Sequence, residues 1–66
     1  MKVFGWIKKN LSEKIRISES KFLGHDLIDI RVCYDKGDGE FGKTKKGISF
    51  KKESLPELIK LLMTIK

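Results

Sequence analysis

The chain has 66 residues, enough for one small domain (residues 1–66) and too few for a second. A single cysteine and a single histidine exclude an internal disulfide and a four-ligand zinc site, two common ways of stabilising so short a chain. Oligomerisation is the third, and we expect a homodimer. Fifteen Lys and Arg against nine Asp and Glu give a net charge of +6, which favours a polyanion: nucleic acid before an anionic membrane surface. A protein with a solvated basic face explains the charge alone equally well.

The N-terminal third predicts two strands and two turns. Residues 2–9 are rich in β-prone side chains and predict a short strand, which ends at a turn over residues 10–13. Residues 14–20 alternate Ile15 and Ile17 with polar neighbours, as a strand with one polar face does. A short turn over residues 22–26 then leads into the next strand.

The central segment, residues 27–50, predicts a β-hairpin. Its first strand has the period-two pattern of a half-buried strand, with the apolar members Ile28, Ile30, Val32 and Tyr34. The turn that follows contains glycines that tolerate positive φ, namely Gly37, Gly39 and Gly42. The chain returns through a cluster of lysines, so the strands of the domain lie within about residues 2–50.

The period changes near the C-terminus, where residues 53–65 predict one α-helix. Its apolar stripe recurs at spacings of three and four: Leu55, Leu58, Ile59, Leu62 and Ile65. Ser54 and Glu57 have the spacing of a capping box, with Pro56 in the first turn. Further apolar residues widen this surface, so we expect the stripe to form a dimer interface. Burial of the helix in its own sheet is the alternative.

No arrangement of residues predicts catalysis, and we expect no enzyme, no cofactor and no metal site. His25 and Asp26 are adjacent, so in a turn their side chains point apart instead of forming a relay. Cys33 lies mid-strand with no second histidine to activate it, which predicts a buried, inert thiol. The DKGDGE segment lacks the spacing of a calcium loop, and its glycines do not lead into a helix as those of a phosphate-binding loop do.

Nucleic-acid binding has better support in the sequence. Lysines gather around the last predicted strand, at Lys43, Lys45, Lys46, Lys51 and Lys52. Flat rings are supplied by Trp6, Phe22, Tyr34 and Phe41. Single-strand binders combine these two elements, because cations follow the phosphates while aromatic rings stack on unpaired bases, at ~1–3 kcal/mol per base. Phe22 and Phe41 lie beside glycines in predicted turns and are the least core-like of the rings.

The hairpin resembles a known family, the single-stranded-DNA-binding domain of the transcriptional coactivator positive cofactor four. The resemblance rests on the IDIR segment (28–31), an aromatic residue soon after it, a turn of Asp, Gly and Glu, and the KKGIS segment (45–49) after a basic run. An F-x-G-x turn at residues 22–25 lies at the matching distance upstream. Each motif is weak alone, but their order and spacing match without a gap from about residue 15 to residue 62.

This resemblance implies an α+β fold, a curved four-stranded antiparallel β-sheet followed by one C-terminal α-helix, with two copies paired through their helices. It implies that the dimer holds two antiparallel single strands, or the strands of a melted duplex, with little sequence preference. By position, Phe22 and Tyr34 are the stacking residues. Contacts with phosphates and base edges fall on Arg31, Lys45 and Lys46, and Gly47 lets the strand approach closely.

Three positions that are commonly lysine in the family carry Leu23, His25 and Gly42. We expect basic residues of the early strands to compensate, namely Lys8, Lys9, Lys14 and Arg16. The predicted interface also includes His25 and Lys43. Strict alternation puts Arg31 and Tyr34 on opposite faces of one strand. Both reach one DNA strand only where a bulge or a strand end redirects Tyr34.

Together these features predict a homodimeric, largely sequence-independent single-stranded-DNA-binding protein, acting in transcription regulation or in DNA replication and recombination with the corresponding machinery. The alternatives are a basic dimeric module that docks an acidic protein partner, and an RNA-binding protein, since the same chemistry permits both. The helix has too few cations for an interfacial anchor, and the broken apolar run at residues 3–7 is no signal peptide. We therefore expect no membrane partner. The serine-rich acidic arm of eukaryotic relatives is absent, which predicts a stand-alone protein in the cytoplasm of a bacterial cell or a phage-infected host, associated with the nucleoid.

Overall fold

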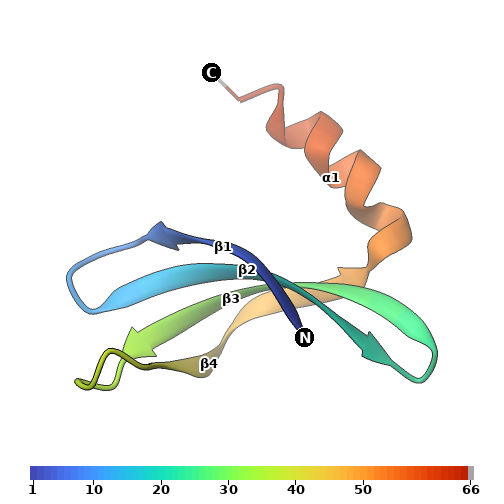
Figure 1. Cartoon of the computed structure of the whole chain (residues 1–66). Coiled ribbons are helices and arrows are strands. Elements are labelled where there is room, and N and C mark those ends of the chain that lie inside the picture. The colour runs from blue at the N-terminus through green and yellow to red at the C-terminus, as the bar shows by residue number, and fades with distance from the viewer. Residues whose placement is uncertain (66) are drawn as a thin grey trace.

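The computed structural model describes residues 1–65 and shows a twisted, four-stranded antiparallel sheet followed by one helix (Figure 1). The strands lie in chain order, each hydrogen-bonded to the next. Their bounds are β1 Lys2–Lys8, β2 Glu13–Phe22, β3 His25–Asp35 and β4 Phe41–Lys51. A 3-10 turn, Lys52–Ser54, leads into the helix α1, Leu55–Leu62. The arrangement confirms the predicted α+β fold.

The connection between β2 and β3 is a two-residue turn. Leu23 and Gly24 have φ values of 51° and 79°, the positive values that let a tight turn follow the twist of a hairpin. Phe22 and His25 already pair across the ladder. The predicted turn over residues 22–26 is therefore too long, because two residues with positive φ suffice to reverse the chain.

The turn between β3 and β4 is built on an aspartate and two glycines. The Asp35 carboxylate accepts a hydrogen bond of 2.7 Å from the Gly37 N–H, and Gly37 and Gly39 have positive φ. Gly42, predicted to lie in this turn, instead belongs to β4 and pairs with Tyr34. A Cβ atom there would lie 2.8 Å from the Tyr34 ring, so this glycine makes room for a ring.

The register divides the sheet into two faces. Pairing of β2 with β3 is continuous from Phe22 opposite His25 to Glu13 opposite Tyr34, so side chains alternate without interruption. We call one side the helix face, because its Ile17 and Ile28 line a groove together with Leu55 of α1. The other side, the basic face, carries Lys14, Arg16, Asp29, Arg31, Lys43 and Lys45.

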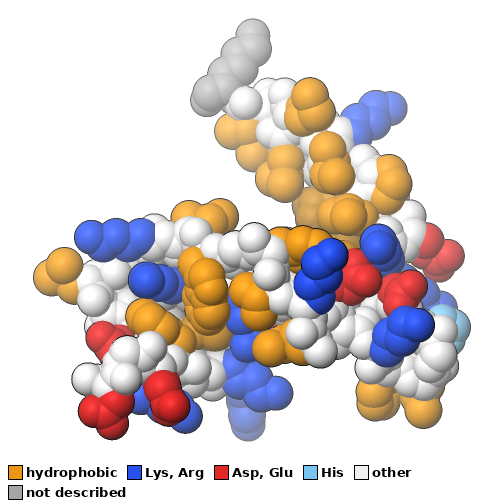
Figure 2. Space-filling model, in the orientation of Figure 1, with side chains coloured by type: hydrophobic (Ala, Val, Ile, Leu, Met, Phe, Trp, Pro, Cys, Tyr) orange, Lys and Arg blue, Asp and Glu red, His pale blue; other side chains and the backbone are white. Residues whose placement is uncertain are grey.

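The chain by itself buries very little. Among the described residues only Ser18, Ile28, Cys33 and Gly42 are buried, which agrees with the predicted buried thiol. No residue of α1 is buried, and the helix rises away from the sheet with apolar side chains along it (Figures 1 and 2). The alternative of a helix sunk into its own sheet is therefore wrong. No described helix has the length and apolar character to cross a membrane.

The start of α1 differs from the predicted capping box. Ser54 occupies the N-cap position, but its side chain makes no capping hydrogen bond. The reason is the preceding 3-10 turn: Ser54 has φ −87° and ψ −6°, in the helical region, whereas a capping side chain needs extended backbone. Pro56 lies in the first turn as predicted, and α1 is shorter than the predicted 53–65.

Candidate nucleic-acid interface

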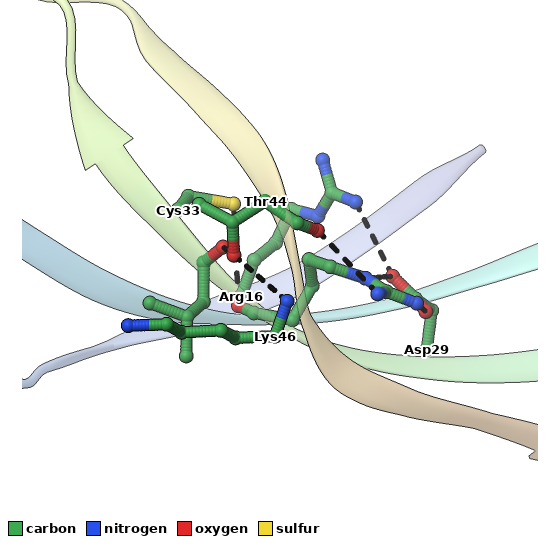
Figure 3. A network of polar contacts seen from close by, with 7 residues as sticks. Arg16, Asp29, Cys33, Thr44 and Lys46 are labelled. Carbon is green, nitrogen blue, oxygen red and sulfur yellow. Dashed lines mark hydrogen bonds and ion pairs between the residues drawn. The ribbon is translucent and has the colours of Figure 1, made fainter.

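Two arginines lie directly opposite each other at the centre of the basic face. Arg16 of β2 pairs with Arg31 of β3, an arrangement that by itself is destabilising because the charges are alike. The Asp29 carboxylate contacts both of them, 2.6 Å from the Arg31 Nη2 and 3.3 Å from the Arg16 Nη2, and the network around Asp29 and Arg16 is drawn in Figure 3. One carboxylate thus holds two guanidinium groups together and leaves the cluster with a net positive charge.

Arg31 is oriented by three hydrogen bonds. Its Nη2 and Nε donate to the two oxygens of Asp29, at 2.6 and 3.4 Å, and its Nη1 donates to the backbone carbonyl of Thr44 at 3.4 Å. An arginine has five N–H donors, so two remain for a ligand. The hydrogen bond with Arg31 lowers the pKa of Asp29, so this carboxylate stays charged well into the acid range.

A bulge in β4 lies next to these arginines. Arg31 pairs with Gly47 and Cys33 pairs with Lys43, so Thr44 and two lysines stand opposite the single residue Val32. The Thr44 hydroxyl donates to the Val32 carbonyl at 2.8 Å and accepts from the Lys46 N–H at 3.0 Å. The threonine side chain thereby satisfies backbone groups that the interrupted ladder leaves unpaired.

A shallow groove of about 420 Å³ runs over this part of the basic face, lined by Ser20, Asp29, Arg31, Lys43, Thr44, Lys45 and Ser49. Its cations exceed its single carboxylate, and its hydroxyl groups add hydrogen-bond donors. Such a lining suits an anionic backbone with regularly spaced phosphates.

The register shows which predicted interface residues share this face. The residues on the basic face are Lys8, Lys14, Arg16, Phe22, His25, Arg31, Lys43, Lys45 and Gly47. His25 lines a separate hollow with Asp26, Lys51, Lys52 and Glu53 near the β2–β3 turn.

Three predicted interface residues lie elsewhere. Tyr34 stays on the helix-face side of β3, because the bulge lies in β4 and leaves the pairing of β3 with β2 unbroken. Glu13, the partner of Tyr34, forms an ion pair of 3.1 Å with Lys9. Lys46 precedes Gly47, the partner of Arg31 on the basic face, so the alternation of the strand puts Lys46 on the other face. The required redirection of Tyr34 is not observed.

Comparisons with known proteins agree with this geometry. The family model for Transcriptional Coactivator p15 (PC4) matches residues 9–61. The chain belongs to the PC4 family. This membership confirms the resemblance inferred from the IDIR and KKGIS segments.

Solved structures of a PC4 homologue from Burkholderia pseudomallei K96243 are similar to this chain over nearly its whole length. The orthorhombic crystal form has 32% sequence identity and a TM-score of 0.89, covering 96% of this chain and 85% of that one. The tetragonal form has the same identity and a TM-score of 0.84, covering 96% and 93%. No curated protein sequence matches the chain.

Sequence reasoning missed Asp29 and Thr44 as parts of this PC4-family site. Asp29 carried a usable signal, because a carboxylate two positions before Arg31 on a strand lies on the same face as that arginine. Thr44 carried none, since its role depends on a bulge whose position the sequence does not define.

Lowering the pH is expected to destabilise the protein partly through Asp29. The folded-state pKa of Asp29 is below its ordinary 3.8, so its contribution is present above that value and is lost as the pH falls through the folded-state pKa. Asp29→Asn should cost about 1–2 kcal/mol at neutral pH, because the charge-assisted bonds to both arginines weaken. The measurement is chemical denaturation from pH 6 down to about pH 2.5. The variant should lose less stability over this range than the wild-type chain; equal losses would contradict this role of Asp29.

Proposed function

We propose that this PC4-family chain is a homodimeric, largely sequence-independent single-stranded-DNA-binding protein. The observation that carries the proposal is the basic face. There Asp29 holds Arg16 and Arg31 in place by ion pairs, beside a groove lined by Lys43 and Lys45. Phosphate contacts of this kind fix a strand without reading its sequence. Family membership and the match to a PC4 homologue support the same conclusion.

A single strand suits this face better than a duplex does. Reading of duplex DNA usually places a helix or a two-stranded ribbon in the major groove, whereas here the cations lie on a sheet surface with α1 attached to the opposite face. Phe22 adds a ring with 63% of its surface exposed at one end of the basic face. An exposed ring beside cations is suited to a ligand whose bases are unpaired, because such bases can stack on it.

The proposed dimer is supported by the apolar side chains that a single chain leaves exposed to solvent. Ile59, Leu61 and Leu62 of α1 are 47–60% exposed, and Ile48 of β4 is 57% exposed on the helix face. Ile48 and Leu61 line an apolar groove of about 240 Å³ between β4 and α1. A chain with so few buried residues gains most from a second copy that covers this surface. Dimerisation through the helix face leaves both basic faces free.

The process we propose is transcription, as the family name Transcriptional Coactivator suggests, together with contacts to the transcription machinery. DNA replication and recombination expose the same kind of strand and are the second candidate. In each case the proposed place of action is the nucleoid in the cytoplasm of a bacterial cell or of a phage-infected host.

Titration of a fluorescent oligonucleotide by the wild-type protein tests this proposal. At about 50 mM salt the protein should bind oligo-dT of about 15 nucleotides more tightly than a duplex of equal length. At about 200 mM salt the affinity should fall steeply, because each neutralised phosphate contributes about −0.7 to the slope of log K against log salt for single strands. Absence of binding, or equal affinity for duplex, would overturn the proposal. Tighter binding of oligo-U would move the function to RNA.

A pair of lysine variants locates the contact on the protein. Lys45→Ala removes a cation of the groove and should lower both the affinity and the salt slope, the latter by about 0.7. Lys60→Ala removes the same charge from α1 and should leave the slope unchanged. Equal effects of the two variants would show that net charge, and not the basic face, governs binding.

A further inference from the structure

Two aromatic rings from opposite edges of the sheet meet on the basic face. Trp6 of β1 and Phe41 of β4 have ring centroids 5.6 Å apart with planes tilted by 44°, although β2 and β3 lie between their strands. The Lys14 Nζ lies 4.8 Å from the centroid of the Phe41 ring. We call these three residues the Trp6 cluster.

The Trp6 cluster is continuous with the cationic centre of the face. Trp6 pairs with Arg16, and Arg16 pairs with Arg31, so the three side chains form one row across neighbouring strands. Lys14 lies one row further along, beside Cys33 and Lys43. A DNA strand whose phosphates contact Arg16 and Arg31 therefore has its bases within reach of the Trp6 cluster.

Trp6 is only partly buried, so its ring has a face that no part of the described chain covers. The indole is 45% exposed, whereas the Cys33 thiol on the same face is fully buried. A purely structural role for Trp6 would be to cover the Cys33 thiol on this face. A smaller side chain could cover that thiol without leaving about half of its own surface in solvent. An exposed ring next to cations is the arrangement on which unpaired bases stack.

The Trp6 cluster also lies apart from Phe22, one of the two stacking residues that the family resemblance implies. Phe22 occupies the row of His25, six residues along β3 from the row of Arg31, or about 20 Å. Trp6 lies in β1, outside residues 9–61 that match the PC4 family model. Its contribution would therefore be a property of this chain and not of the matched family region.

We propose that the Trp6 cluster is a stacking site for an unpaired nucleobase, with Trp6 as the ring that receives the base and Lys14 as a contact for the neighbouring phosphate. The inference rests on the proposed single-stranded-DNA binding and extends the path of the strand from the arginines to the β1 edge of the sheet. Ligands of the site are unpaired bases of any sequence, because every base has a face to stack.

Tryptophan fluorescence measures binding at this site directly, because Trp6 is the only tryptophan of the chain. Titration of the wild-type protein with unlabelled oligo-dT should give a saturable loss of tryptophan emission. A strand of equal length made of abasic deoxyribose phosphates should bind through its phosphates and leave the emission unchanged. Trp6→Leu should bind labelled oligo-dT about 5- to 150-fold more weakly, the range that corresponds to one stacked base, while Trp6→Phe should retain most of the affinity.

Phe4→Leu is the matched control. Phe4 is an exposed ring of the same strand with a lysine Nζ 5.3 Å from its centroid, but it lines the groove on the helix face. Its removal should leave affinity unchanged at protein concentrations where the oligomeric state is the same. Unchanged emission with bound oligo-dT, or wild-type affinity of Trp6→Leu, would overturn the stacking site while leaving the proposed function intact. No binding of labelled oligo-dT by the wild-type protein would overturn both.

Discussion

Replacing Ile59 and Leu62 of α1 by aspartate is expected to convert the proposed dimer into monomers that are largely unfolded. Both side chains are about half exposed in one chain, at 47% and 52%. In a monomer, substitutions at such positions change stability by no more than about 0.5 kcal/mol. In a dimer, two unpaired carboxylates per chain would enter an apolar interface, at a cost of several kcal/mol. The large effect is therefore diagnostic of the interface.

Sedimentation equilibrium and circular dichroism at matched protein concentrations measure the two consequences. Lys60→Asp is the control, because it also changes the charge by −2 on the same helix while leaving the apolar stripe intact. This control should remain a folded dimer. A double variant that stays dimeric and folded would show that α1 does not form the interface, and a wild-type chain that sediments as a monomer would rule out the dimer itself.

The strands were predictable because their signal is local. Alternation at Ile15 and Ile17, and again from Ile28 to Val32, identifies which residues share a face, and the structure keeps that alternation through an unbroken β2–β3 register. The predictions failed where backbone geometry depends on neighbouring segments. Gly42 has the composition of a turn residue but serves as space for the Tyr34 ring, and Ser54 has the spacing of a cap but follows a 3-10 turn.

The site was predictable as a set of residue types but not as a surface. Arg31, Lys43 and Lys45 share a groove because the register of β3 and β4 brings them together. Lys46, between the bulge at Thr44 and Gly47, falls on the other face, and no pattern in the lysine-rich segment indicates where the bulge begins. Tyr34 illustrates the same limit. Its stacking role is assigned by its position in the family pattern, and that position does not say which face of the sheet the side chain occupies.

Gly47→Ala is expected to destabilise the sheet strongly. Gly47 has φ 152°, which side-chain-bearing residues rarely adopt, and a Cβ atom there would lie 2.3 Å from the Ile30 carbonyl oxygen and 2.9 Å from the Arg31 Cα. These neighbours are backbone atoms of the central strand β3, so they cannot move aside as a flexible side chain can. The family resemblance implies a close approach of DNA at Gly47, and in the structure the chain's own backbone also approaches this glycine closely.

The expected cost is about 3 kcal/mol, from backbone strain and overpacking together. For a chain of this length that corresponds to a fall of about 12–24 °C in Tm. Gly5→Ala is the matched control, because a Cβ atom at that strand position meets nothing within 4 Å and the change should stay within about 0.5 kcal/mol. Thermal unfolding of both variants at one protein concentration provides the comparison. Similar Tm values for the two would mean that β4 shifts to admit the methyl group; Arg31, which pairs with Gly47, would then shift with it and oligo-dT affinity would fall instead.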